Sequence, residues 1–183
     1  MLVYSLISLF LIGSFISTSE GKYEIDKGVV KSDLAHIGCD VCLEAMAQIY
    51  YAAEVAKSKA PYKKLNEMAI FDIIDKICAP DSSGGLWIRT LDITEHKEGG
   101  RRYLSLEKPG GMSTCGKECG TIEKSCIDLL DEDIDRDELA VLLYKNKINS
   151  LEELQVFCWL FDFLFNWVPM AIENNDDATT IKC

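Results

Sequence analysis

Apolar residues recur at helical spacing through most of the chain. Between residues 34 and 57 they stand three or four positions apart, with small alanines between them, and this period predicts a long first helix. A second apolar stripe runs from residue 65 to Cys78 and stops before Pro80, which predicts a second helix. A third helix is expected over about residues 117–130, because apolar residues and two cysteines share one face there.

Two capping signals predict two more helices. Asp135 and Ser150 each stand three residues before a glutamate, Glu138 and Glu153, and an apolar set follows each pair. In such a capping box the first side chain accepts a hydrogen bond from a free N–H of the first helical turn. Two short helices are therefore expected in the last third of the chain.

A change of composition interrupts the helical pattern after residue 80. Residues 86–94 are rich in Trp, Ile, Leu and Thr, a strand composition, and a second short strand is expected over residues 103–107, after a polar turn that contains Gly99 and Gly100. This pattern predicts a β-hairpin with a long loop, inserted over residues 81–111. The predicted fold class is mainly α, a disulfide-stapled helical bundle with a small inserted β-hairpin.

The first 17 residues are apolar and uncharged, and small residues follow them. We interpret residues 1–19 as a signal peptide, with an uncleaved anchor as the alternative, because no basic residue precedes Lys22. The predicted organisation continues with a linker (20–33), one domain (34–167) and a C-terminal tail (168–183). The hairpin insertion belongs to the domain.

The formal net charge is −11. Such a charge argues against nucleic acid as a partner, and it opposes approach to anionic lipid at neutral pH. No local motif assembles a nucleophile, a base and an orienting group, and His36 and His96 do not form a catalytic pair. We therefore expect no enzymatic activity and no cofactor.

Eight cysteines follow the predicted signal peptide, and an even number in a secreted chain predicts a disulfide framework. Two other interpretations are weighed. Cys39 and Cys42 have the spacing of a redox motif, although no strand of thioredoxin type precedes them. The spacings within Cys39, Cys42, Cys115 and Cys119 also permit a zinc site, but thiolates in an oxidising compartment favour disulfides, so no metal is predicted. The cysteines are Cys39, Cys42, Cys78, Cys115, Cys119, Cys126, Cys158 and Cys183.

Two further stretches carry chemistry. Seven carboxylates lie between Asp128 and Glu138, but the glycine and terminal glutamate of a calcium loop are missing there, so a solvated turn between helices is expected. An aromatic run near the end provides candidates for lipid contact, with a place in the core or in a groove lining as the alternative. These candidates are Trp159, Phe161, Phe163 and Trp167.

The spacing of Cys39-x-x-Cys42, Cys78, Cys126 and Cys158 on successive amphipathic helices resembles a saposin B-type domain. The inserted hairpin is similar to that of the canopy branch of saposin-like proteins. The motifs Gly85-Leu-Trp-Ile and Cys115-Gly-Lys-Glu-Cys-Gly-Thr-Ile-Glu resemble plant saposin B-domain proteins. The resemblance covers about residues 34–165.

The resemblance implies two nested disulfides, Cys42 with Cys158 and Cys78 with Cys126. It also implies a partner for Cys39 a few residues after Cys158, where this chain has no cysteine. Cys39 is then either free or joined to Cys183. The proximity of the two additional cysteines, 115 and 119, suggests a local bridge.

For function, the resemblance implies a non-enzymatic protein of the secretory pathway that binds lipid or a membrane surface through its amphipathic helices. The alternative is a canopy-like lumenal cofactor that assists the folding or trafficking of client proteins. A weaker third hypothesis is a thiol oxidoreductase that uses Cys39 and Cys42. An extracellular or endolysosomal location is expected, with the endoplasmic reticulum lumen as the alternative. A homodimer is one of the partners that this interpretation allows.

Overall fold

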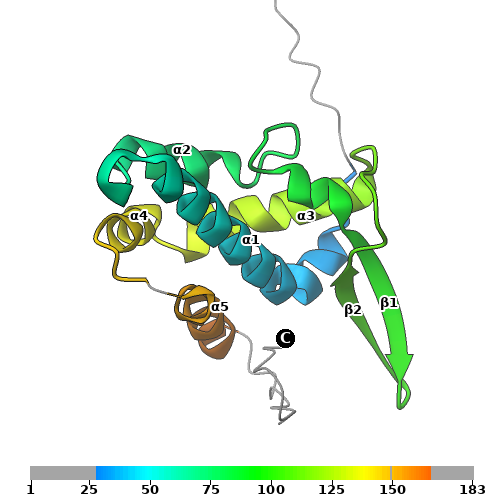
Figure 1. Ribbon diagram of the computed structural model, residues 1–183. Helices are drawn as coiled ribbons and strands as arrows, with labels where there is room; N and C mark the ends of the chain where they lie inside the picture. The colour runs from blue at the N-terminus through cyan, green and yellow to red at the C-terminus, as the bar shows by residue number, and fades with distance from the viewer. Residues whose placement is uncertain (1–27, 149, 166–183) are drawn as a thin grey trace, which may run out of the picture.

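The computed structural model describes residues 28–148 and 150–165. The predicted signal peptide, the tail, Trp167 and Cys183 lie outside the described residues. Five α-helices and one antiparallel β-hairpin form the described part (Figure 1). They are α1 (Lys31–Lys59), α2 (Glu67–Lys76), β1 (Asp92–Glu98), β2 (Arg101–Glu107), α3 (Lys117–Asp128), α4 (Arg136–Tyr144) and α5 (Leu151–Phe165).

The longest element, α1, has 29 residues and packs against α2, α3, α5 and β2 (Figure 1). It begins three residues before the predicted start, so the last positions of the predicted linker are helical. It ends where Ala60 turns extended before Pro61, because a residue that precedes proline disfavours the helical conformation. Its buried face repeats every three or four residues: Ile37, Val41, Ala45, Met46, Ile49 and Ala53.

The predicted capping signals are confirmed. The Asp135 carboxylate accepts hydrogen bonds from the backbone N–H groups of Asp137 and Glu138, at 2.9 and 3.0 Å. The Ser150 hydroxyl accepts one from the N–H of Glu153 at 3.2 Å. Each bond satisfies a donor that a helix start leaves unpaired, so α4 begins as expected and α5 follows its predicted cap.

The expected strand over residues 86–94 is wrong in its first half. Leu86–Thr90 form a single 3₁₀ turn, labelled η2, and β1 begins at Asp92. Adjacent Trp87 and Ile88 are both buried, whereas adjacent residues of a strand face opposite sides of a sheet. The indole N–H of Trp87 also donates to the carbonyl oxygen of Ile77 at 2.8 Å, and this buried bond fixes the turn.

The hairpin turn is also tighter than predicted. β1 and β2 pair from Asp92↔Glu107 to Glu98↔Arg101, so only Gly99 and Gly100 remain between them. Their φ angles are 57° and 82°, which two-residue hairpin turns require and which glycine adopts without a Cβ clash. The expected long loop is therefore absent between these strands.

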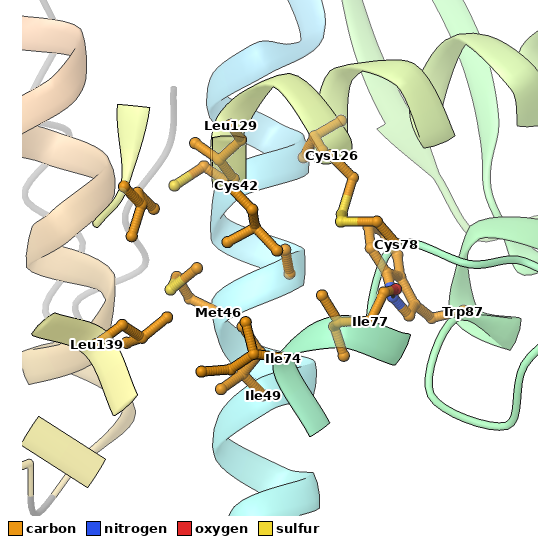
Figure 2. Close-up of a cluster of buried hydrophobic side chains, with 14 of the residues drawn as sticks. Cys42, Met46, Ile49, Ile74, Ile77, Cys78, Trp87, Cys126, Leu129 and Leu139 are labelled. Atoms are coloured by element: carbon orange, nitrogen blue, oxygen red, sulfur yellow. Dashed lines mark hydrogen bonds between the residues drawn. A yellow bond between two sulfur atoms is a disulfide. The ribbon is translucent and has the colours of Figure 1, made fainter. Parts of the chain in front are cut away.

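One hydrophobic core joins the helices and one face of the hairpin. Figure 2 shows Met46 and Ile49 of α1 turned toward Leu139 of α4 and Ile74 of α2. Ile93, Leu104 and Leu106 of the hairpin pack against the edge of this core. These three residues share one sheet face in the observed register.

Two glycines offer a matched test of this packing. A Cβ at Gly85 would lie 2.1 Å from the carbonyl oxygen of Ala79, whereas a Cβ at Gly38, within α1, would meet nothing within 4 Å. We predict that Gly85→Ala lowers the free energy of unfolding by about 3 kcal/mol. Gly38→Ala should raise it by up to about 1 kcal/mol, because alanine favours a helix interior. Urea unfolding of both variants checks the pair, and equal effects would contradict the assigned packing.

Candidate functional site

Two long-range disulfides join the helices in pairs. Cys42–Cys158 connects α1 to α5, and Cys78–Cys126 connects the chain just after α2 to α3 (Figure 2 shows the latter). These are the two pairings that the family resemblance implied. The disulfide-bonded framework fits an oxidising environment of the secretory type.

The remaining described cysteines exclude two alternative chemistries. Cys115 is bonded to Cys119, so the predicted local bridge is present. Cys42 and Cys119 are thus both oxidised, which contradicts the four-cysteine zinc interpretation. Cys39 is disulfide-bonded as well, but not to Cys42, so these two do not form a redox pair. Cys183, the partner considered for Cys39, lies outside the described residues.

Polar bonds attach α1 to its neighbours through its N-terminal half. At its start the N–H of Val30 donates to the Thr121 hydroxyl of α3 at 3.0 Å. Further along, the N–H of Leu106 donates to the carboxylate of Asp40 at 3.2 Å. Glu44 then accepts an ion-paired hydrogen bond from Lys108 at 2.9 Å. α3 and the hairpin are therefore fixed to this half of α1 by directional bonds.

The C-terminal half of α1 is held differently. Over residues 45–59 the described hydrogen bonds and ion pairs join residues of α1 to one another or to Ala60, the residue that follows the helix. The contacts of this half with other elements are made by apolar side chains, among them Ala45, Met46, Ile49 and Ala53, each at most 5% exposed. Separating this half from α2 would therefore expose apolar surface without breaking a described polar bond.

His96 lies on β1, not in a loop as expected. Its ring stacks on Tyr103, with ring centroids 5.0 Å apart. Its Nε2 lies 2.8 Å from the Ser105 hydroxyl and 3.3 Å from the Glu107 carboxylate. A Ser-His-carboxylate triad needs the serine and the carboxylate on different ring nitrogens. Because both contacts fall on the same nitrogen, this arrangement is not a triad.

The acidic segment forms a wide turn, as expected for a link between helices. Leu129–Asp133 is a π-type turn after α3, and Asp131 forms an ion pair with Arg136. Burial, followed by repulsion from Glu132 and Asp128, raises the pKa of Asp133 above the ordinary aspartate value. This carboxyl therefore takes up a proton more readily than an isolated aspartate.

The aromatic candidates are placed only in part. Trp159, Phe161 and Phe163 belong to the C-terminal part of α5, but their side chains, like the whole of Trp167, lie outside the described part of the structure. Two earlier residues of α5, Leu154 and Cys158, are buried in the core. None of the described helices is both long and apolar enough to cross a bilayer.

No family model, curated protein or solved structure matches this chain.

The disulfides generate a prediction about stability. Cys42 and Cys158 are 116 positions apart in the sequence, whereas Cys115 and Cys119 are four positions apart. Because a longer loop loses more chain entropy on closure, replacing both Cys42 and Cys158 by alanine should cost about 5 kcal/mol, and replacing the local pair about 2 kcal/mol. Denaturant unfolding of the two double variants tests this order. An unchanged stability in the first variant would contradict the scaffold role.

Asp40 provides a second prediction. Burial raises the pKa of its carboxyl above the ordinary aspartate value, and the hydrogen bond from Leu106 offsets part of this effect. The folded protein thus protonates Asp40 at higher pH than the unfolded chain does, so this group adds stability as the pH falls through its folded-state pKa. We predict that Asp40→Asn is at least as stable as the parent at neutral pH and gains less on acidification.

Asp40→Ala is the matched variant, because it removes the acceptor as well as the charge. It should lose about 1 kcal/mol at neutral pH, since the N–H of Leu106 loses its protein partner. Urea unfolding at neutral and acidic pH separates the two effects. If the stability of Asp40→Asn depended on pH in the same way as that of the parent, Asp40 would not be the source of this pH dependence.

Proposed function

We propose that this chain is a non-enzymatic, saposin-like protein of the secretory pathway that binds lipid through its amphipathic helices. The observation that carries the proposal is the uneven attachment of α1. Directional bonds hold its N-terminal half to α3 and the hairpin, whereas apolar packing in the core, with α2 as a neighbouring helix, holds its C-terminal half. Such a domain can open at one end while the other end stays assembled.

An opened C-terminal half would offer a continuous apolar surface to acyl chains. Met46, Ile49 and Ile74 are at most 1% exposed in the described state, so opening them to water would be costly. Lipid would replace their lost partners, because burial of an acyl chain contributes about 0.8 kcal/mol per CH₂ group. The lipid would therefore stabilise the open state in proportion to the length of acyl chain that becomes buried in the protein.

The long-range disulfides would limit how far such opening goes. Cys42–Cys158 keeps α5 beside α1, and Cys78–Cys126 keeps the end of α2 beside α3. The helices of each pair would then stay joined while the C-terminal half of α1 moves away from α2. This behaviour needs an oxidising compartment, in keeping with the proposed extracellular or endolysosomal location.

Acid would favour lipid binding. The net charge of −11 opposes an anionic surface at neutral pH. The raised pKa values of Asp40 and Asp133 mean that protonation at these sites begins at higher pH than in ordinary aspartates. Binding to anionic lipid would consequently strengthen as the pH falls.

The second candidate function is that of a canopy-like lumenal cofactor that binds client proteins. The hairpin favours it, because the face turned away from the core carries Thr94, His96, Tyr103 and Ser105 in the observed register. Tyr103 is 47% exposed, and exposed tyrosines are common anchors at protein interfaces. A client would bind this outer face without opening the core.

Hydrogen exchange tests the lipid proposal. We predict that phosphatidylcholine vesicles with added phosphatidylserine, at a pH of about 4.5, raise the exchange rates of amides in residues 45–59 and in α2. Residues 31–40 and α3 should remain protected, because polar bonds and a disulfide hold them. Lipid should also co-purify with the protein, and the same incubation at neutral pH serves as the control.

Two outcomes would contradict the lipid proposal. One is the absence of co-purified lipid at both pH values. The other is co-purified lipid with unchanged exchange in residues 45–59, which would exclude opening of the core. Suppressed aggregation of a reduced secretory protein, lost in Tyr103→Ser, would favour the client-binding function instead.

A further inference from the structure

A short lysine-rich segment closes the C-terminal end of α1. It contains Lys57, Lys59, Lys63 and Lys64 within eight residues, and no acidic residue lies between them. Lys57 pairs with Glu54 at 3.2 Å within α1. Within the described part of the chain, no ion pair engages Lys59 or Lys63, and both are exposed. Their charge is therefore available to a partner.

Exposed apolar side chains accompany these lysines. Tyr51 and Val55 are 56% and 52% exposed, and their spacing of four residues places them on one side of α1. Tyr62, in the middle of the lysine segment, is 100% exposed. Its φ and ψ are 58° and 18°, a left-handed conformation that is unfavourable for a residue with a Cβ. The backbone thus presents this ring to the solvent at a conformational cost.

The fold brings further lysines to the same end of the molecule. The ammonium group of Lys64 lies 5.3 Å from the ring centroid of Tyr144, the last residue of α4. Exposed Lys145 and Lys147 follow directly. This end lies away from the hairpin (Figure 1). We call residues 57–64 and 144–147 the basic end. It concentrates six of the 19 basic residues in a chain whose net charge is −11.

We propose that the basic end is a docking surface for the anionic headgroups of a lipid bilayer. Lysines near such a surface are attracted to it individually, over a distance set by the salt concentration. Tyrosine is enriched at the headgroup level of membranes, where its ring lies in apolar surroundings and its hydroxyl remains in water. A fully exposed Tyr62 between Lys59 and Lys63 combines both properties.

The surface chemistry favours a bilayer over an acidic protein. The core of a specific protein interface is depleted of charged residues, and lysine is less frequent in such interfaces than on the rest of the surface. Here the lysines project with exposed apolar side chains, Tyr51, Val55 and Tyr62. Glu54, which pairs with Lys57, and Glu67 of α2 are the nearest carboxylates in sequence. A fluid, negatively charged layer with an apolar interior complements such a surface without a shaped partner.

This inference rests on the proposed lipid function only in its choice of partner. It requires neither acid nor an open core, because the lysines are charged and the apolar side chains are exposed in the described state. Docking at neutral pH and lipid uptake at acidic pH can therefore be tested separately. Either can fail while the other holds.

The test uses vesicles of phosphatidylcholine with about one-third phosphatidylserine, at neutral pH and low salt. The parent protein should co-sediment with these vesicles but not with pure phosphatidylcholine, and high salt should release it. Lys59→Gln/Lys63→Gln should weaken binding about 25-fold, or about fivefold per lysine. Tyr62→Ser should weaken it several-fold.

The matched control is Lys97→Gln/Lys117→Gln, which removes the same charge from exposed positions on β1 and α3. It should bind like the parent. An equal loss in both double variants would show that total charge, not the basic end, governs binding. The absence of binding by the parent at low salt would overturn the proposal. A polyglutamate peptide bound with the same lysine dependence, without vesicle binding, would assign the basic end to acidic proteins.

Discussion

Burial of one face of α1 is the constraint on which the rest of the structure depends. The residues of this face, from Ile37 to Ala53, are at most 5% exposed, and α2, α3, α5 and β2 all contact this helix. The shortest helices, α4 and α2, have nine and ten residues, lengths that are marginal for an isolated helix in water. Their stability comes from packing their apolar faces into the core built on α1. The disulfides Cys42–Cys158 and Cys78–Cys126 add covalent links to this same core.

The hairpin is attached through its edges as well as through its apolar face. Ile93 and Leu106 are register partners, and each donates its backbone N–H to a helix carboxylate: Ile93 to Glu118 at 3.4 Å and Leu106 to Asp40 at 3.2 Å. Both N–H groups therefore point away from the partner strand. Carboxylates from α1 and α3 thus occupy opposite edges of the ribbon near its base. This arrangement satisfies backbone N–H donors that an open edge would otherwise offer to another strand. It also gives a structural role to the charged, half-buried Asp40.

The sequence predicted the parts of this fold that depend on local patterns. Helical periodicity identified α1 to α3, and Asp135 and Ser150 identified the starts of the last two helices, because each acts within one turn. The turn at Leu86–Thr90 could not be found in this way, since the bond from Trp87 to Ile77 joins residues ten positions apart and overrides a β-like composition. Cysteine spacing alone also left the pairing open, and the implied pairs came from the family resemblance. The sequence contains the lysines of residues 57–64, but the negative net charge of the whole chain gives no sign of such a basic cluster. Only the structure shows that Tyr62 between them is exposed.

The two proposals meet on the same half of α1. Residues 45–59, which lack described polar bonds to other elements, lead directly into the lysine segment of the basic end. A protein docked through this end would hold its least firmly attached helical half next to the bilayer. As the pH falls, the carboxylates elsewhere lose charge, whereas the lysines of the basic end keep theirs. Acid would then weaken the repulsion between bilayer and protein without weakening the docking contact. The uneven distribution of charge and the uneven attachment of α1 would thus direct opening toward the lipid, because the end that binds the surface adjoins the half of α1 that apolar packing holds to the other elements.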